Sequence, residues 1–152
     1  MRATRLVIIL LAFLPSLFII KAAETELTEM RLVSDSLIYM IHSNVDCDGQ
    51  KKFAELTFGD RGFNAGLLFA TVTVKYNFCG FKPSKYIGFI TIGDCLIFVD
   101  KSGLTHMDWF NYLPNKRIFH STEVSARDGT ACWNFILFSK TDIVLQSVSK
   151  GW

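Results

Sequence analysis

The chain has 152 residues, of which half are hydrophobic and a fifth are charged, and its formal net charge at pH 7 is +2. This length suits one domain that buries a real hydrophobic core. The small net charge excludes a global electrostatic attraction to nucleic acid or to an anionic membrane, so binding to either would need a local basic patch.

The first 23 residues have the order of a secretory signal peptide. Residues 1–5 are basic, residues 6–20 are apolar, and residues 21–23 include two alanines before an acidic stretch. A retained membrane helix is the alternative, but the apolar run of 15 residues is shorter than the ~20 that a bilayer requires. Removing residues 1–23 leaves 129 residues with a net charge of −1. We therefore expect a secreted protein with no membrane segment in its mature form.

The segment 24–43 is interpreted as an N-terminal extension. Residues 24–30 are polar, which favours a frayed start. Residues 32–41 are apolar enough for a first strand, with a short helix as the alternative. The main domain is placed at residues 44–152. Near its start, an Asp-Cys-Asp-Gly turn at 46–49 leads into the next element.

A single helix is predicted between Lys51 and Ala70. Its apolar residues fall near helical spacing, namely Phe53, Leu56, Phe63, Leu67 and Ala70. Three glycines in the span weaken this helix, by up to ~1 kcal/mol each relative to alanine.

The remainder of the chain has strand patterns. Residues 86–92 and 95–99 flank a Gly-Asp turn and predict a hairpin. The aromatic-rich residues 107–113 predict a further strand, which Pro114 is expected to end.

A second hairpin is the clearest pattern in the chain. Residues 133–138 and 143–148 are apolar and rich in β-branched and aromatic side chains, and a polar stretch at 139–142 joins them. One helix followed by an antiparallel sheet indicates an α+β domain.

Four cysteines, Cys47, Cys79, Cys95 and Cys132, remain after removal of the signal. In an oxidising compartment this even number predicts two disulfide bonds, for which three pairings are possible. Metal binding is the alternative, but neither a Cys-x-x-Cys motif nor a His/Cys pair at zinc-finger spacing occurs. We expect a disulfide-stabilised domain without a metal or cofactor.

Four segments of the sequence resemble segments of one group of proteins. These segments are Asn44–Gln50, Lys82–Tyr86, Phe110–Pro114 and Gly129–Val148. In this order they resemble the ribonuclease-like secreted effectors of powdery mildew fungi and the related fungal guanyl-preferring ribonucleases, over roughly residues 44–148. The resemblance implies a microbial ribonuclease-like fold, in which a single helix packs on a curled antiparallel β-sheet. It also implies a secreted virulence protein that enters a plant host cell and promotes infection by binding host protein or host RNA.

The resemblance further implies a disulfide pairing. In that family one bridge ties the start of the domain to its end, which would join Cys47 to Cys132 and leave Cys79 to pair with Cys95. We expect the protein to be a monomer.

The chain departs from the ribonucleases where their catalytic residues lie. RNA cleavage needs a base, an acid and a cation that stabilises the charged transition state. At the positions that the resemblance matches to the catalytic residues, this chain has neutral side chains: Ser84, Asn111 or Tyr112, Asn134 or Phe135, and Gln146 or Ser147. None of these transfers a proton near neutral pH, so we expect a catalytically inactive pseudo-ribonuclease without catalytic residues.

Two alternatives from other classes stay open. The first is an active secreted ribonuclease with relocated histidines, drawn from His42, His106 and His120 with the neighbouring carboxylates of Asp108 and Glu123. The second is a small secreted β-sandwich signalling ligand, similar to the self-recognition proteins of plants. The span 51–70 discriminates between the folds, because a helix there favours the ribonuclease fold and a strand favours the sandwich.

Binding is the function that remains for the expected inactive domain. Aromatic residues interleaved with basic ones have the composition of a platform for single-stranded RNA. The predicted residues for RNA or partner binding are Lys82, Ser84, Lys85, Tyr86, Tyr112 and Asn134. Binding of a host protein through the sheet face or the loops is the other expectation.

Overall fold

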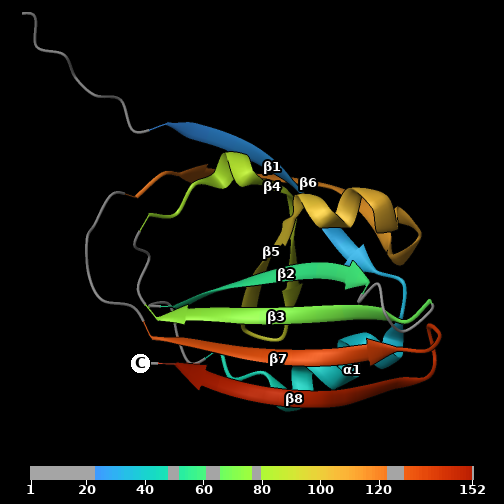
Figure 1. Cartoon of the computed structure of the whole chain (residues 1–152). Helices are drawn as coiled ribbons and strands as arrows, with labels where there is room; N and C mark the ends of the chain where they lie inside the picture. Colours follow the sequence, from blue (N-terminus) through green and yellow to red (C-terminus); the bar gives the residue numbers. More distant parts are fainter. Residues whose placement is uncertain (1–22, 48–51, 61–65, 77–79, 123–128, 152) are drawn as a thin grey trace, which may run out of the picture.

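The computed structural model describes residues 23–47, 52–60, 66–76, 80–122 and 129–151. In this part the chain forms an eight-stranded sheet, one α-helix and two 3-10 helices (Figure 1). The predicted signal peptide lies outside the described residues except for its last position, and so do Cys79 and Glu123.

The strands form one mixed sheet in the order β6-β1-β4-β5-β2-β3-β7-β8. The pairs β1–β4 and β2–β5 are parallel, and the other neighbours are antiparallel. The elements in chain order are β1 (Glu24–Leu32), α1 (Asp35–Asn44), β2 (Lys52–Asp60), β3 (Leu68–Tyr76), η1 (Pro83–Lys85), β4 (Tyr86–Ile92), β5 (Cys95–Asp100), η2 (Lys101–Trp109), β6 (Phe110–His120), β7 (Thr130–Leu137) and β8 (Ile143–Gly151).

The predicted α+β fold, a single helix on a curled antiparallel sheet, is wrong. The span 51–70 contains the strand β2 and the start of β3, which pair with each other in antiparallel fashion. The physical reason is a period of two that the helical interpretation overlooked. Ala54, Leu56 and Phe58 of β2 are buried while Glu55 and Thr57 between them are partly exposed, which is the alternation of a pleated, half-buried strand.

The α-helix lies earlier in the chain than predicted. Residues 24–30 are not frayed, because they belong to β1, which pairs with β4 and β6. Helix α1 begins within the segment 32–41, for which a strand was predicted with a short helix as the alternative, and it ends beyond that segment at Asn44. Ser34 caps it by accepting a hydrogen bond from the Leu37 amide at 3.0 Å, and Leu37 and Ile41 form its buried stripe.

Replacing Ser34 by alanine is expected to lower the free energy of unfolding by about 1 kcal/mol, because the helix loses its N-cap. The same hydroxyl also donates to the Lys140 carbonyl, so the link between α1 and the turn before β8 is lost as well. Urea denaturation measures the effect. Ser43→Ala, an exposed change in the last turn of the same helix, is the control and should leave the midpoint nearly unchanged.

Both predicted hairpins are confirmed. Strands β4 and β5 pair around Gly93, whose φ of 60° suits the turn, and β7 pairs with β8 as predicted. The expected end of a strand at Pro114 is wrong, because β6 continues to His120. The proline is tolerated because β6 is an edge strand and its register with β1 shifts at this point.

The core has two parts, one on each face of the central strands β4 and β5. The larger part packs aliphatic side chains around α1, including Leu37, Ile41 and Ile97. The smaller part is mostly aromatic and consists of Leu27, Phe53, Phe81, Tyr86, Phe89, Phe98 and Phe119; we call it the aromatic cluster. Because β4 and β5 are buried on both faces, their side chains build the core and leave little of these strands for a surface site.

The predicted disulfide pairing is wrong, although a disulfide is present. Cys47 bonds to Cys95, with their Cα atoms 5.4 Å apart, and this bond joins the segment after α1 to the start of β5. Cys132 is a free thiol. It lies between the buried Ala131 and Trp133 on β7, so it faces away from the core in which Cys95 is buried.

Candidate functional site

The predicted binding residues at the start of β4 lie on a short 3-10 turn. Lys82, Ser84 and Lys85 are exposed there, and the Lys85 amide donates to the Lys82 carbonyl at 3.1 Å. These three side chains present two cations and a hydroxyl to solvent.

Tyr86, the fourth predicted binding residue, is buried, with 7% of its surface exposed. Its ring lies in the aromatic cluster, stacked on Phe81 with ring centroids 5.8 Å apart. Its hydroxyl donates to the Glu55 carboxylate, which also accepts from Lys75 Nζ at 2.8 Å. Burial, followed by the hydrogen bond to Glu55, raises the pKa of Tyr86 above its ordinary value. The phenol therefore stays neutral and bonds to Glu55 at the edge of the aromatic cluster. Because its ring is buried, no RNA nucleobase can stack on it.

Tyr112 and Asn134 lie on different strands, far from the turn that carries Lys82. Tyr112 is exposed on β6, opposite Met30. Asn134 on β7 accepts from Thr71 Oγ1 at 2.7 Å and donates to Ser147 Oγ at 2.9 Å, which forms a polar row across three strands. The six predicted residues therefore do not converge on one site.

The three histidines are also separated from one another. His106, in η2, lies against the Phe58 ring with centroids 5.6 Å apart. His120, at the far end of β6, has Nδ1 3.8 Å from Glu24 Oε1. Since η2 precedes β6 and His120 ends it, roughly 35 Å of extended strand lies between these two histidines. His42 lies in the last turn of α1, beside Gly93.

Among the described residues, no group of three or more histidines, cysteines or carboxylates is arranged to hold a metal ion.

No helix in the described part of the chain is both long enough and apolar enough to cross a membrane.

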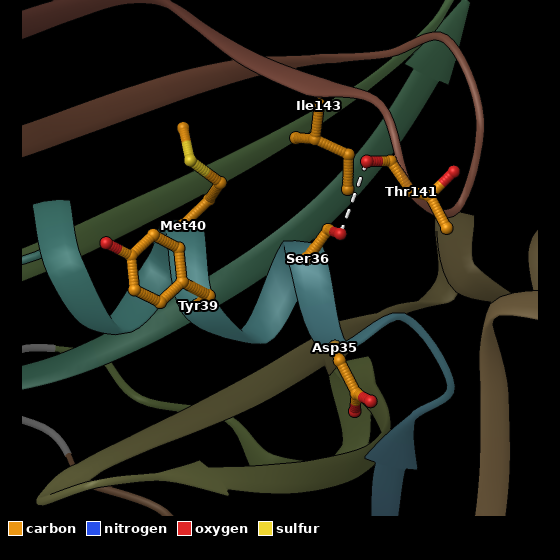
Figure 2. A pocket seen from close by; sticks show the side chains of 6 residues that line it. All are labelled: Asp35, Ser36, Tyr39, Met40, Thr141 and Ile143. Atoms are coloured by element: carbon orange, nitrogen blue, oxygen red, sulfur yellow. Dashed lines mark hydrogen bonds between the residues drawn. The ribbon is translucent and has the colours of Figure 1, made fainter.

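A groove lies between helix α1 and the start of strand β8. It has a volume of about 420 Å³ and is lined by Asp35, Ser36, Tyr39, Met40, Thr141 and Ile143; we call it the α1–β8 groove. Figure 2 shows Tyr39 and Met40 projecting from the helix, with Thr141 and Ile143 on the neighbouring segment. The Ser36 hydroxyl donates to the Thr141 carbonyl at 3.3 Å and holds the two walls together.

Strand β8 lies at one end of the sheet, so its outer side pairs with no other described strand. Val144 and Val148 on β8 are each 47% exposed, and Tyr39 in the adjoining groove is 69% exposed. Between Ile143 and Ser149 the strand has no charged residue and no proline, two of the features that natural proteins use to protect an edge. Its register with β7 shifts once, between Leu145 and Ser147. We call the outer main-chain side of β8 the β8 edge. Val144 and Val148 flank it on opposite faces of the sheet, because Val144 pairs with Ile136 and Val148 pairs with the core residue Trp133.

Sequence reasoning missed this site, although it identified β8 as a strand. One local signal pointed to the helical wall, since Ser34 followed by Asp35 is typical of a helix start. The proximity of the two walls has no such signal, because the hydrogen-bonded residues Ser36 and Thr141 are 105 positions apart.

No protein-family model, no curated protein and no solved structure matches this chain.

Proposed function

We propose that the chain is a secreted, non-catalytic protein that acts by binding a host protein through the β8 edge. The observation that carries this proposal is the exposure of Val144 and Val148 on an edge strand that has no charged residue and no proline between Ile143 and Ser149. Such an edge accepts a strand from a partner, because main-chain hydrogen bonds give affinity and the alternating side chains give specificity.

A protein partner fits the surface better than RNA does. Single-stranded RNA needs exposed aromatic rings on which bases stack. Phe81, Tyr86 and Trp109 are buried instead, and the exposed Tyr112 lies on β6, away from the turn that carries Lys82. Two other lysines of the sheet are already paired with carboxylates, Lys75 with Glu55 and Lys116 with Glu26. These pairs reduce the positive field that a phosphate backbone would meet.

A secreted signalling ligand is the second candidate function, and one observation favours it. Strand β2 and the start of strand β3 lie in the span 51–70, where the resemblance to the ribonuclease-like effectors implies a helix. Both candidates act by binding a protein, so they share the β8 edge and differ in the partner. Delivery into a host cell belongs to the effector proposal alone.

Capture of a partner from plant extract tests the proposal, using protein recovered from the medium of a secreting culture. The double variant Val144→Lys/Val148→Lys places charge on the β8 edge at two exposed positions, and we expect it to weaken capture about tenfold or more. Ile118→Lys makes a matched change at an exposed position on the opposite edge strand, β6, and should retain capture.

Treatment of the extract with ribonuclease separates a protein partner from an RNA-bridged one. Capture that persists after treatment supports the proposal, and capture that disappears assigns the function to RNA. An RNA-cleavage assay on the same material tests the catalytic alternative. Turnover that is abolished in His106→Ala or His120→Ala would overturn a non-catalytic function.

A further inference from the structure

We propose that the partner segment is an extended basic peptide, which adds as a strand along β8 and places one lysine or arginine side chain in the α1–β8 groove. This inference rests on the proposed function and specifies the chemistry of its partner. It follows from the side chains that line the groove, their charge and the adjoining edge strand.

The helical wall of the groove has a carboxylate and an aromatic ring on one face. Asp35 and Tyr39 are four residues apart on α1, so they are neighbours on the helix surface. Both side chains are exposed. Figure 2 shows the two side chains projecting from the helix in different directions. Each of them attracts a cation at this wall, Asp35 by its negative charge and Tyr39 by the face of its phenol ring.

The other walls suit the stem of a basic side chain. Met40 and Ile143 are partly buried, and they offer apolar surface along which the methylene groups of lysine or arginine pack. A volume of about 420 Å³ is ample for one such side chain. An acidic side chain would instead bring a second negative charge next to Asp35.

Among the described residues, no basic side chain lines the groove to neutralise Asp35. Lys140 lies in the turn before β8, next to the lining residue Thr141, and its ammonium group is directed elsewhere. It donates to the Asp108 carbonyl, lies 3.6 Å from the Asp108 carboxylate and sits over the Trp109 ring. The groove therefore keeps a net negative charge that a basic partner can complement.

Strand addition and the groove act together because they share β8. Ile143 lines the groove and also begins the strand whose outer main-chain groups are unpaired among the described residues. A peptide strand lying along β8 can therefore point a long side chain back into the groove, while its backbone bonds to the edge.

The test uses synthetic peptides and the ¹⁵N-labelled secreted protein. The first peptide alternates threonine and valine around one central lysine, and two others have glutamate or leucine in its place. We expect the lysine peptide to shift the amide signals of residues 143–149 and 35–40. We expect it to bind about two- to fivefold more tightly than the leucine peptide, as for a partly exposed ion pair, and the difference should shrink as salt is raised.

Three variants assign the charge preference to one residue. Asp35→Asn should remove the preference for lysine over leucine without weakening the leucine peptide, and Asp35→Glu should retain the preference. Asp94→Asn removes an exposed carboxylate from the β4–β5 turn and should change nothing. Equal binding of the lysine and glutamate peptides, or signal changes confined to other strands, would overturn the inference.

Failure of the basic-peptide inference can be told apart from failure of the proposed docking at the β8 edge. If capture of the host protein depends on Val144 and Val148 but no peptide prefers lysine, the inference fails and the docking edge stands. If capture is independent of both valines, both proposals fail. Self-association of the protein that Val144→Lys/Val148→Lys abolishes would assign the edge to a second copy and overturn the peptide inference.

Discussion

Truncation of Phe98 to alanine is expected to lower the free energy of unfolding by about 3–5 kcal/mol. Phe98 is 1% exposed and occupies the centre of the aromatic cluster. Its ring centroid lies 4.8 Å from that of Phe81, 5.2 Å from that of Tyr86 and 5.0 Å from that of Phe119. The variant leaves a cavity between rings held by three different segments, which cannot all collapse into it.

Urea denaturation followed by tryptophan fluorescence measures this loss. Phe138→Ala is the matched control, because Phe138 is 53% exposed just before the β7–β8 turn. This control should cost less than about 0.5 kcal/mol. Since small domains have a total stability of only ~5–15 kcal/mol, a loss below about 1 kcal/mol for Phe98→Ala would show that the aromatic cluster is not part of the cooperative core.

The aromatic cluster also explains why composition misled the assignment of a binding surface. Tyr86 follows two lysines and a serine, a local pattern that suits an exposed stacking site. It starts β4, however, and β4 lies between β1 and β5 with both of its faces covered. A residue count shows how many aromatic side chains must be buried but not which ones. That choice depends on which strands become central, and the sheet order sets it.

Local patterns predicted the elements that depend on neighbours in the chain. The β4–β5 hairpin forms around Gly93 and the β7–β8 hairpin around residues 139–142, so alternation and turn residues were sufficient to find both. The residues of β2 fit two periods, because Phe53 and Leu56 are also three positions apart as on a helix. The pairings of β2 with β3 and with β5 decide between them, and the pairing with β5 joins segments far apart in sequence.

The candidate site was the least predictable part of the molecule. Asp35 and Tyr39 fall in a segment that was predicted as a strand, with a short helix as the alternative. On a strand they would share one face and be separated there by the side chain of Leu37. On α1 they are direct neighbours in a groove that β8 completes. The chemistry of the groove therefore depends on a helix start at Ser34 and on the docking of that helix against the last strand, and only the first of these has a local signal.

Removing the Cys47–Cys95 disulfide is expected to lower the free energy of unfolding by about 4 kcal/mol. The bond closes a loop with a sequence separation of 48, and the chain-entropy model gives that magnitude for a loop of this length. The loop includes β2, β3 and β4, so the unfolded chain gains freedom over the middle of the sheet. The double variant Cys47→Ala/Cys95→Ala, compared with the parent protein in urea, measures the loss.

Cys132→Ala separates this pairing from the one that the family resemblance implied. Cys132 is a free thiol whose sulfur lies 3.5 Å from Thr73 Oγ1, so its removal should cost less than about 1 kcal/mol. Digestion without reduction should yield one linked peptide that contains Cys47 and Cys95. A linked peptide joining Cys47 to Cys132, with a large loss in Cys132→Ala, would mean that the end of α1 is tied to β7. Helix α1 would then have to leave the core beside β5, and the groove that it forms with β8 would be lost with it.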